Sequence, residues 1–133
     1  MTGVFADTYF YLALFNTRDA HHRRVVEYLG TMTGKVVTTQ WVLTELADAM
    51  ASVRERRQIQ DKFRILNDDP GTTVVEASGA WFERGLALYN SRPDKSWSLT
   101  DCISFAVMAG MGLTEALTGD HHFEQAGFVA LLA

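Results

Sequence analysis

The chain has 133 residues, 47% of them hydrophobic and 21% charged, which suffices for one domain with a buried core but not for two. Its net charge of -4 argues against a module that holds duplex DNA by broad phosphate neutralisation, although two bound divalent cations would cancel that charge and leave nucleic acid open. It contains no run of about 18 uncharged apolar residues and no basic signal-peptide stretch, so we expect a cytoplasmic protein that spans no membrane.

Short β-branched runs alternate with longer amphipathic stretches along the whole chain. Five strands are predicted, over residues 4–6, 35–39, 72–76, 115–118 and 128–132. Helices are predicted over residues 8–15, 19–29, 40–51, 52–66 and 79–90, then from an N-cap at Ser98, and in a short turn after Asp120. Asp101 follows Ser98 at the spacing of a capping box, and the apolar residues after it predict a helix buried on all sides.

This alternation of strands and helices implies βαβ units, so residues 1–133 are expected to form a single α/β domain. The expected architecture is a three-layer α/β/α arrangement around a central, mainly parallel sheet of four to five strands. Ligands bind such sheets beyond the carboxyl ends of the strands. Asp7 and Asp120 follow strands, whereas Asp101 and Glu45 lie in the first turns of helices, so all four carboxylates are expected at this edge.

Oxygen ligands from four separate elements, without a cysteine or an obligatory histidine, select a hard cation such as Mg²⁺ or Mn²⁺ over Zn²⁺. Two carboxylates about 4 Å apart repel each other by roughly 4 kcal/mol at an effective dielectric of about 20, and a bound cation would reverse this repulsion. Two such cations can activate a water and stabilise the leaving oxygen of a phosphodiester. Metal-dependent phosphodiester chemistry is therefore the favoured interpretation of the four acids.

Four segments, in this order and spacing, resemble the PIN domain family: VFADTYFYLAL, TTQWVLTELADAM, SLTDCISFAVM and EALTGDHHFEQAGF. The resemblance covers the whole chain and implies a PIN-like fold that cleaves RNA. It implies that the following acids hold Mg²⁺ or Mn²⁺: Asp7, Glu45, Asp101 and Asp120. Thr8 and Thr118 would be supporting hydroxyls. A single-domain chain of this size is most similar to the VapC-type ribonuclease toxins, which implies a homodimer neutralised by a small antitoxin protein.

The loop before Asp101 contains Arg92, Lys95 and Trp97, which could neutralise a phosphate and stack on a base. We predict that these three residues contact the RNA substrate, and an ordinary surface loop is the alternative.

Histidine and cysteine do not suggest a zinc site. Cys102 is the only cysteine, which excludes an internal disulfide and a cysteine-based zinc site. The neighbours His21 and His22 are expected to point in different directions, one partly buried and one in solvent. His121 or His122 is considered only as a phosphate contact.

Other interpretations remain open at this point. Asp101 could be only a helix cap, Glu45 could face solvent, and Asp7 and Asp120 could simply begin helices. At the level of function, the alternative is a PIN-fold binding module without catalytic activity, acting through protein or RNA partners. Phosphoryl transfer with Asp7 as nucleophile is a third hypothesis, although the chain lacks a second acid two residues after it.

Overall fold

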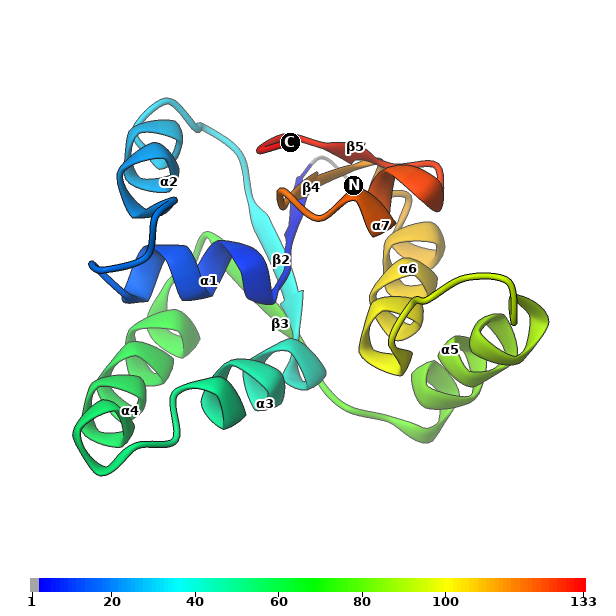
Figure 1. The fold of residues 1–133 in the computed structure, drawn as a ribbon, viewed down its shortest axis with the longest axis horizontal. Helices are drawn as coiled ribbons and strands as arrows, with labels where there is room; N and C mark the ends of the chain where they lie inside the picture. The colour runs from blue at the N-terminus through cyan, green and yellow to red at the C-terminus, as the bar shows by residue number, and fades with distance from the viewer. Residues whose placement is uncertain (1–2) are drawn as a thin grey trace.

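A parallel sheet of five strands forms the centre of the computed structural model, which describes residues 3–133 (Figure 1). The strands are β1 Val4–Ala6, β2 Val36–Thr39, β3 Thr72–Val75, β4 Glu115–Leu117 and β5 Val129–Ala130. Their order is β3-β2-β1-β4-β5, and every neighbouring pair is parallel. The chain adds β2 and β3 on one side of β1 and then β4 and β5 on its other side. This change of side places the topological switch point between β1 and β4.

Helices cover both faces of this sheet, so the predicted three-layer α/β architecture is confirmed, with a sheet that is entirely parallel. One face carries α1 Thr8–Phe15, α2 His22–Leu29, α3 Gln40–Ala49 and α4 Val53–Asp68 (Figure 1). The other face carries α5 Gly79–Ser91 and α6 Leu99–Met111, and α7 His121–Gln125 contacts α6. Within residues 3–133 no helix combines the length and apolar character that a membrane span requires.

Helix α6 lies in the core, as its composition predicts, because every residue from 102 to 108 is buried. Its packing partner α5 approaches very closely at Gly85. A Cβ atom on Gly85 would lie 2.3 Å from Cγ1 and 2.8 Å from Cα of Ile103, so only glycine allows this separation of the two helices. The close contact holds α6, and with it Asp101 in its first turn, at a fixed place beside the sheet.

Some element boundaries differ from the prediction because side chains accept hydrogen bonds from nearby backbone N–H groups. Helix α2 begins at His22, three residues later than predicted, since Oδ1 of Asp19 accepts a hydrogen bond from the His21 N–H at 2.8 Å and forms a turn. The helical stretch from residue 40 to 66 is interrupted after Ala49, and Ser52 caps α4 by accepting from the Glu55 N–H at 3.2 Å. The last strand is shorter than predicted.

Candidate active site

Asp7 lies at the carboxyl end of β1 and caps helix α1. Its Oδ2 accepts a hydrogen bond from the Thr118 hydroxyl at 2.9 Å, and its Oδ1 accepts from the Phe10 N–H at 3.4 Å. The residue is only 8% exposed. Burial raises the pKa of Asp7 to about 8, the two hydrogen bonds oppose this change, and the charges of Asp120 and Asp101 raise the pKa further. Asp7 is therefore a buried acid surrounded by other acids.

Thr118 connects Asp7 with Asp120 across the switch point. Leu117 of β4 pairs with Ala6 of β1, so the next residue of each strand, Thr118 and Asp7, lie side by side. The buried Thr118 Oγ1 also accepts a hydrogen bond from the Asp120 N–H at 2.9 Å. Asp120 then caps α7, because its Oδ1 accepts from the His122 N–H at 2.9 Å. One hydroxyl thus fixes both acids at the ends of their strands.

Asp101 reaches the same place from α6. It forms the predicted capping box, in which Asp101 Oδ2 accepts from the Ser98 N–H at 3.2 Å and Ser98 Oγ accepts from the Asp101 N–H at 3.0 Å. The same Oδ2 lies 3.2 Å from Nδ1 of His122, which is also 3.5 Å from Oδ1 of Asp120. The imidazole therefore bridges the carboxylates of Asp101 and Asp120. The Asp101 side chain therefore caps α6 and also contacts His122.

Glu45 approaches from the opposite layer. It lies in the second turn of α3 and is partly buried, and the Thr8 hydroxyl donates a hydrogen bond to Glu45 Oε1. Since Thr8 directly follows Asp7, this bond places Glu45 beside the start of α1. The structure therefore brings Asp7, Asp101 and Asp120 together around Thr118 and His122, and it connects Glu45 to this group through Thr8.

The loop before α6 is held against α7. Nε1 of Trp97 donates to Oε1 of Gln125 at 3.0 Å, and the ring packs edge-on against Phe105 with centroids 5.2 Å apart. Trp97 is only 6% exposed. The cations of Arg92 and Lys95 lie 5.2 and 6.0 Å from its ring centroid. This burial argues against base stacking on Trp97 and favours a role in supporting the two cations.

Arg92 is engaged within the loop. Its guanidinium forms two hydrogen bonds with Asp94, of 2.9 and 3.0 Å, so an incoming phosphate would compete with that carboxylate. Lys95 forms no ion pair among the described residues. Of the three predicted RNA contacts, Lys95 is thus the one whose charge is unpaired.

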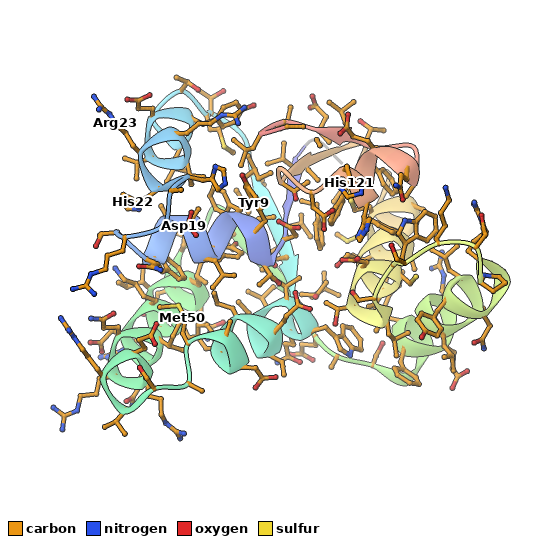
Figure 2. The ribbon with its side chains drawn as sticks, in the orientation of Figure 1. Tyr9, Asp19, His22, Arg23, Met50 and His121 are labelled. Carbon is orange, nitrogen blue, oxygen red and sulfur yellow. The ribbon has the colours of Figure 1, made fainter. Side chains whose placement is uncertain are left out.

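The histidines near Asp120 are the main feature that sequence reasoning missed. A phosphate contact was considered for His121 and His122, yet the rings face the acids, and donor atoms of both lie with Asp120 in a group that spans at most 4.8 Å. His121 lies at the start of α7 (Figure 2). The signal available in the sequence was the position of both residues directly after a capping aspartate. The other pair behaves as predicted, with His21 exposed and His22 partly buried.

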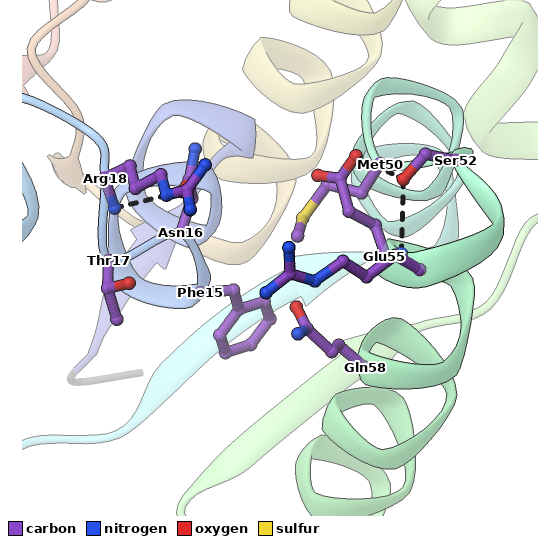
Figure 3. Close-up of a pocket in the computed structure, with 9 residues that line it drawn as sticks. Phe15, Asn16, Thr17, Arg18, Met50, Ser52, Glu55 and Gln58 are labelled. Carbon is purple, nitrogen blue, oxygen red and sulfur yellow. Dashed lines mark hydrogen bonds between the residues drawn. The ribbon is translucent and has the colours of Figure 1, made fainter.

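A separate pocket lies between the end of α1 and the start of α4 (Figure 3). It has a volume of about 340 Å³. Its lining residues are Phe15, Asn16, Thr17, Arg18, Met50, Ser52, Arg54, Glu55 and Gln58. None of the four carboxylates lines it, and Glu55, its only acid, accepts a hydrogen bond from the Ser52 hydroxyl at 2.7 Å. The carboxylate cluster at the switch point is therefore the better candidate for chemistry.

The donor set of that cluster fits a hard divalent cation. Asp101 and Asp120 lie near Asp7, a buried acid whose pKa is already raised, and within residues 3–133 no lysine or arginine forms an ion pair with any of the four predicted acids. Oxygen ligands without a lysine or arginine counter-charge are the set that Mg²⁺ and Mn²⁺ prefer.

Comparison with known proteins identifies the family of the chain. The profile of the PIN domain family matches residues 4–129. The chain belongs to the PIN domain family. Members of this family are generally metal-dependent, typically as nucleases, which agrees with the donor set described above. A search of curated proteins gives no significant match.

Several solved structures share this PIN fold. VapC20 of Mycobacterium tuberculosis, described as a toxin that cleaves the sarcin-ricin loop, is 26% identical with a TM-score of 0.88, over 96% of this chain and 98% of that one. VapBC2 of Rickettsia felis, bound to a DNA fragment from its promoter, is 13% identical with a TM-score of 0.70 over 97% of each chain. A toxin–antitoxin complex from Klebsiella pneumoniae is 21% identical with a TM-score of 0.64, over 89% and 87%. The chain thus resembles VapC toxins in fold and length.

Proposed function

We propose that this PIN domain is a Mg²⁺- or Mn²⁺-dependent endoribonuclease and the toxin of a type II toxin–antitoxin pair. The observation that supports the proposal is the proximity of Asp7, Asp101 and Asp120 at the switch point, with Glu45 bound to Thr8, and no lysine or arginine partner for these acids among residues 3–133. The similarity to VapC20, a toxin that acts on RNA, supports RNA as the substrate. RNA as substrate also agrees with the predicted cytoplasmic location.

Each acid has a proposed role that follows from its place. Asp7, Asp101 and Asp120 would hold the cation, and Glu45 would assist the metal or orient a water. When bound, Mg²⁺ or Mn²⁺ would supply an activated water and charge neutralisation at the phosphodiester. Thr118 keeps Asp7 and Asp120 in register through its two hydrogen bonds, and Thr8 orients Glu45. Such support matters because small displacements of catalytic groups reduce rates strongly.

The positive charges of the loop before α6 would guide the substrate. Lys95 has no ion-pair partner among the described residues, and Ser96 and Trp97 contact α7 beside Asp120. We therefore propose Lys95 as a phosphate contact, with Arg92 as a second one that must first leave Asp94. Trp97 would hold this loop in place.

The decisive experiment measures RNA cleavage by the parent protein and by Asp7→Asn. A sarcin-ricin loop oligonucleotide is the first substrate to test, because VapC20 is described as cleaving that loop. We expect cleavage with Mg²⁺ or Mn²⁺, none with EDTA, and background activity for Asp7→Asn. Asp48→Asn is the matched control, since Asp48 is exposed on α3 outside the cluster. An Asp7→Asn protein that cleaves as fast as the parent would refute the proposal.

The partners are proposed by the same similarity. A small antitoxin is expected because related toxins are described in toxin–antitoxin complexes, and a short reading frame immediately upstream would support it. A homodimer is also proposed, and a monomeric mass in light scattering would contradict it. If the protein binds such a partner but neither cleaves RNA nor binds Mn²⁺ in calorimetry, it is the binding module without catalysis.

A further inference from the structure

We propose that Asp120, His121 and His122, together with Asp101, form a binding site for a borderline transition-metal ion such as Zn²⁺. Donor atoms of the first three residues lie within 4.8 Å of one another. The fourth residue joins through His122, whose Nδ1 is 3.2 Å from Asp101 Oδ2. Two nitrogens and two oxygens are a ligand set that differs in chemistry from the all-oxygen set proposed for Mg²⁺ or Mn²⁺.

Three distances between donor atoms are close to those that a tetrahedral ion requires. Zinc bonds to nitrogen and oxygen of about 2.0–2.1 Å place neighbouring ligand atoms about 3.3 Å apart in a tetrahedron. In the structure, Nδ1 of His122 lies 3.2 Å from Asp101 Oδ2 and 3.5 Å from Asp120 Oδ1. Nδ1 of His121 lies 3.7 Å from Asp120 Oδ1. Asp101 lies outside the group of three donors that fall within 4.8 Å of one another, so its carboxylate would have to move to complete the coordination.

The two histidine rings are oriented as ligands rather than as ordinary surface side chains. Consecutive residues on a helix normally point in different directions, but here the ring centroids of His121 and His122 are only 4.7 Å apart. The second ring nitrogen of His122, Nε2, lies 3.5 Å from the Ser96 hydroxyl. Ligand histidines usually hydrogen-bond through their other nitrogen, which fixes the tautomer and the ring orientation. Ser96 is in position to do so for His122.

This site shares Asp101 and Asp120 with the proposed catalytic cluster, so Zn²⁺ is expected to compete with Mn²⁺ for the protein. That consequence rests on the proposed function, whereas binding of Zn²⁺ itself does not. Mn²⁺ released by added Zn²⁺ can be followed by electron paramagnetic resonance without any RNA.

Zn²⁺ titration of the untagged full chain by calorimetry, with Co²⁺ absorption as a probe of tetrahedral geometry, tests the proposal. We expect one Zn²⁺ per chain and an affinity that falls more than about tenfold in His121→Ala and in the His121→Ala/His122→Ala double variant, because even outer-shell changes cost 10- to 100-fold. His121 has a side chain that is 71% exposed, so its loss leaves folding intact. His21→Ala, which removes an exposed histidine outside the donor group, should bind Zn²⁺ like the parent.

Two results would overturn the inference. One is parent-like Zn²⁺ affinity in the double variant, which would mean that the carboxylates alone hold the ion. The other is the absence of Zn²⁺ binding by the parent. Zn²⁺ binding without RNA cleavage would contradict the proposed function and support the Zn²⁺ site. RNA cleavage without histidine-dependent Zn²⁺ binding would support the proposed function and contradict the Zn²⁺ site.

Discussion

Replacing Asp7 by asparagine should make the metal-free protein more stable at neutral pH. The two side chains have nearly the same shape, so the substitution mainly removes the ability to ionise. Burial, together with the charges of Asp101 and Asp120, raises the pKa of Asp7 from 3.8 to about 8. Near pH 7 the folded chain must therefore keep a proton that the unfolded chain has already released, and this costs free energy of folding.

The size of the effect follows from the difference between the pKa values. About three pH units separate 3.8 from pH 7, and at about 1.36 kcal/mol per unit they set a ceiling of about 4 kcal/mol on the destabilisation. A carboxamide accepts the Thr118 hydrogen bond less well than the acid, a loss of roughly 1 kcal/mol. We expect Asp7→Asn to raise the free energy of unfolding by about 2 kcal/mol at pH 7 in EDTA.

The sign of the pH dependence distinguishes this explanation from a simple packing effect. Between pH 3.8 and about 8 the folded protein binds more protons at Asp7 than the unfolded chain does, so the stability of the parent falls as pH rises through this window. The advantage of Asp7→Asn should be near zero at about pH 4 and largest at about pH 8. Urea unfolding in EDTA across this range measures it. An advantage that does not change with pH, or an asparagine variant that is less stable at pH 8, would refute the reasoning.

Three further substitutions test the support of the site, each by urea unfolding and by RNA cleavage. Thr118→Val removes the hydroxyl that binds Asp7 and leaves the Asp120 N–H unpaired. We expect it to lower the free energy of unfolding by about 1–3 kcal/mol, and Thr118→Ser to restore most of this loss. Gly85→Ala should lower the free energy of unfolding by at least about 1–3 kcal/mol and reduce cleavage, because its Cβ would collide with Ile103 and displace α6. Gly79→Ala is the control and should be tolerated, because a Cβ on Gly79 meets no atom within 4 Å. Trp97→Phe removes one indole hydrogen bond to α7 and should cost about 1 kcal/mol, with weaker RNA binding as the loop loosens.

The convergence of the acids was predictable because it depends on topology more than on side-chain detail. Asp7 and Asp120 follow separate strands, and the carboxyl ends of parallel strands share one edge of the sheet. The capping-box spacing of Ser98 and Asp101 also predicted the start of α6. The strand order was not readable from local patterns. It is this order, with β1 beside β4, that places Thr118 within 2.9 Å of Asp7.

Features that depend on tertiary contacts could not be predicted from the sequence. From the sequence, His121 or His122 is considered only as a phosphate contact, whereas in the structure both rings face Asp120 in the first turn after this cap. Trp97 lies in a polar loop, which suggested a free ring. Its burial is decided by Phe105, a residue of a helix that follows in the chain, and no local pattern indicates which surface the loop will cover.

In the proposed metal site, the burial of Asp7 would couple cation binding to folding. A cation that binds only the folded state at 100 times its dissociation constant stabilises that state by about 2.7 kcal/mol, which is comparable to the expected effect of the Asp7 substitution. Saturating Mg²⁺ or Mn²⁺ should thus offset most of the cost of burying this acid in the parent and do little for Asp7→Asn. The stability order of the two proteins is then expected to approach equality, or to reverse, when the cation is added. An acid buried for packing alone would show no such dependence on the cation, so this comparison separates a metal ligand from a structural carboxyl without measuring cleavage.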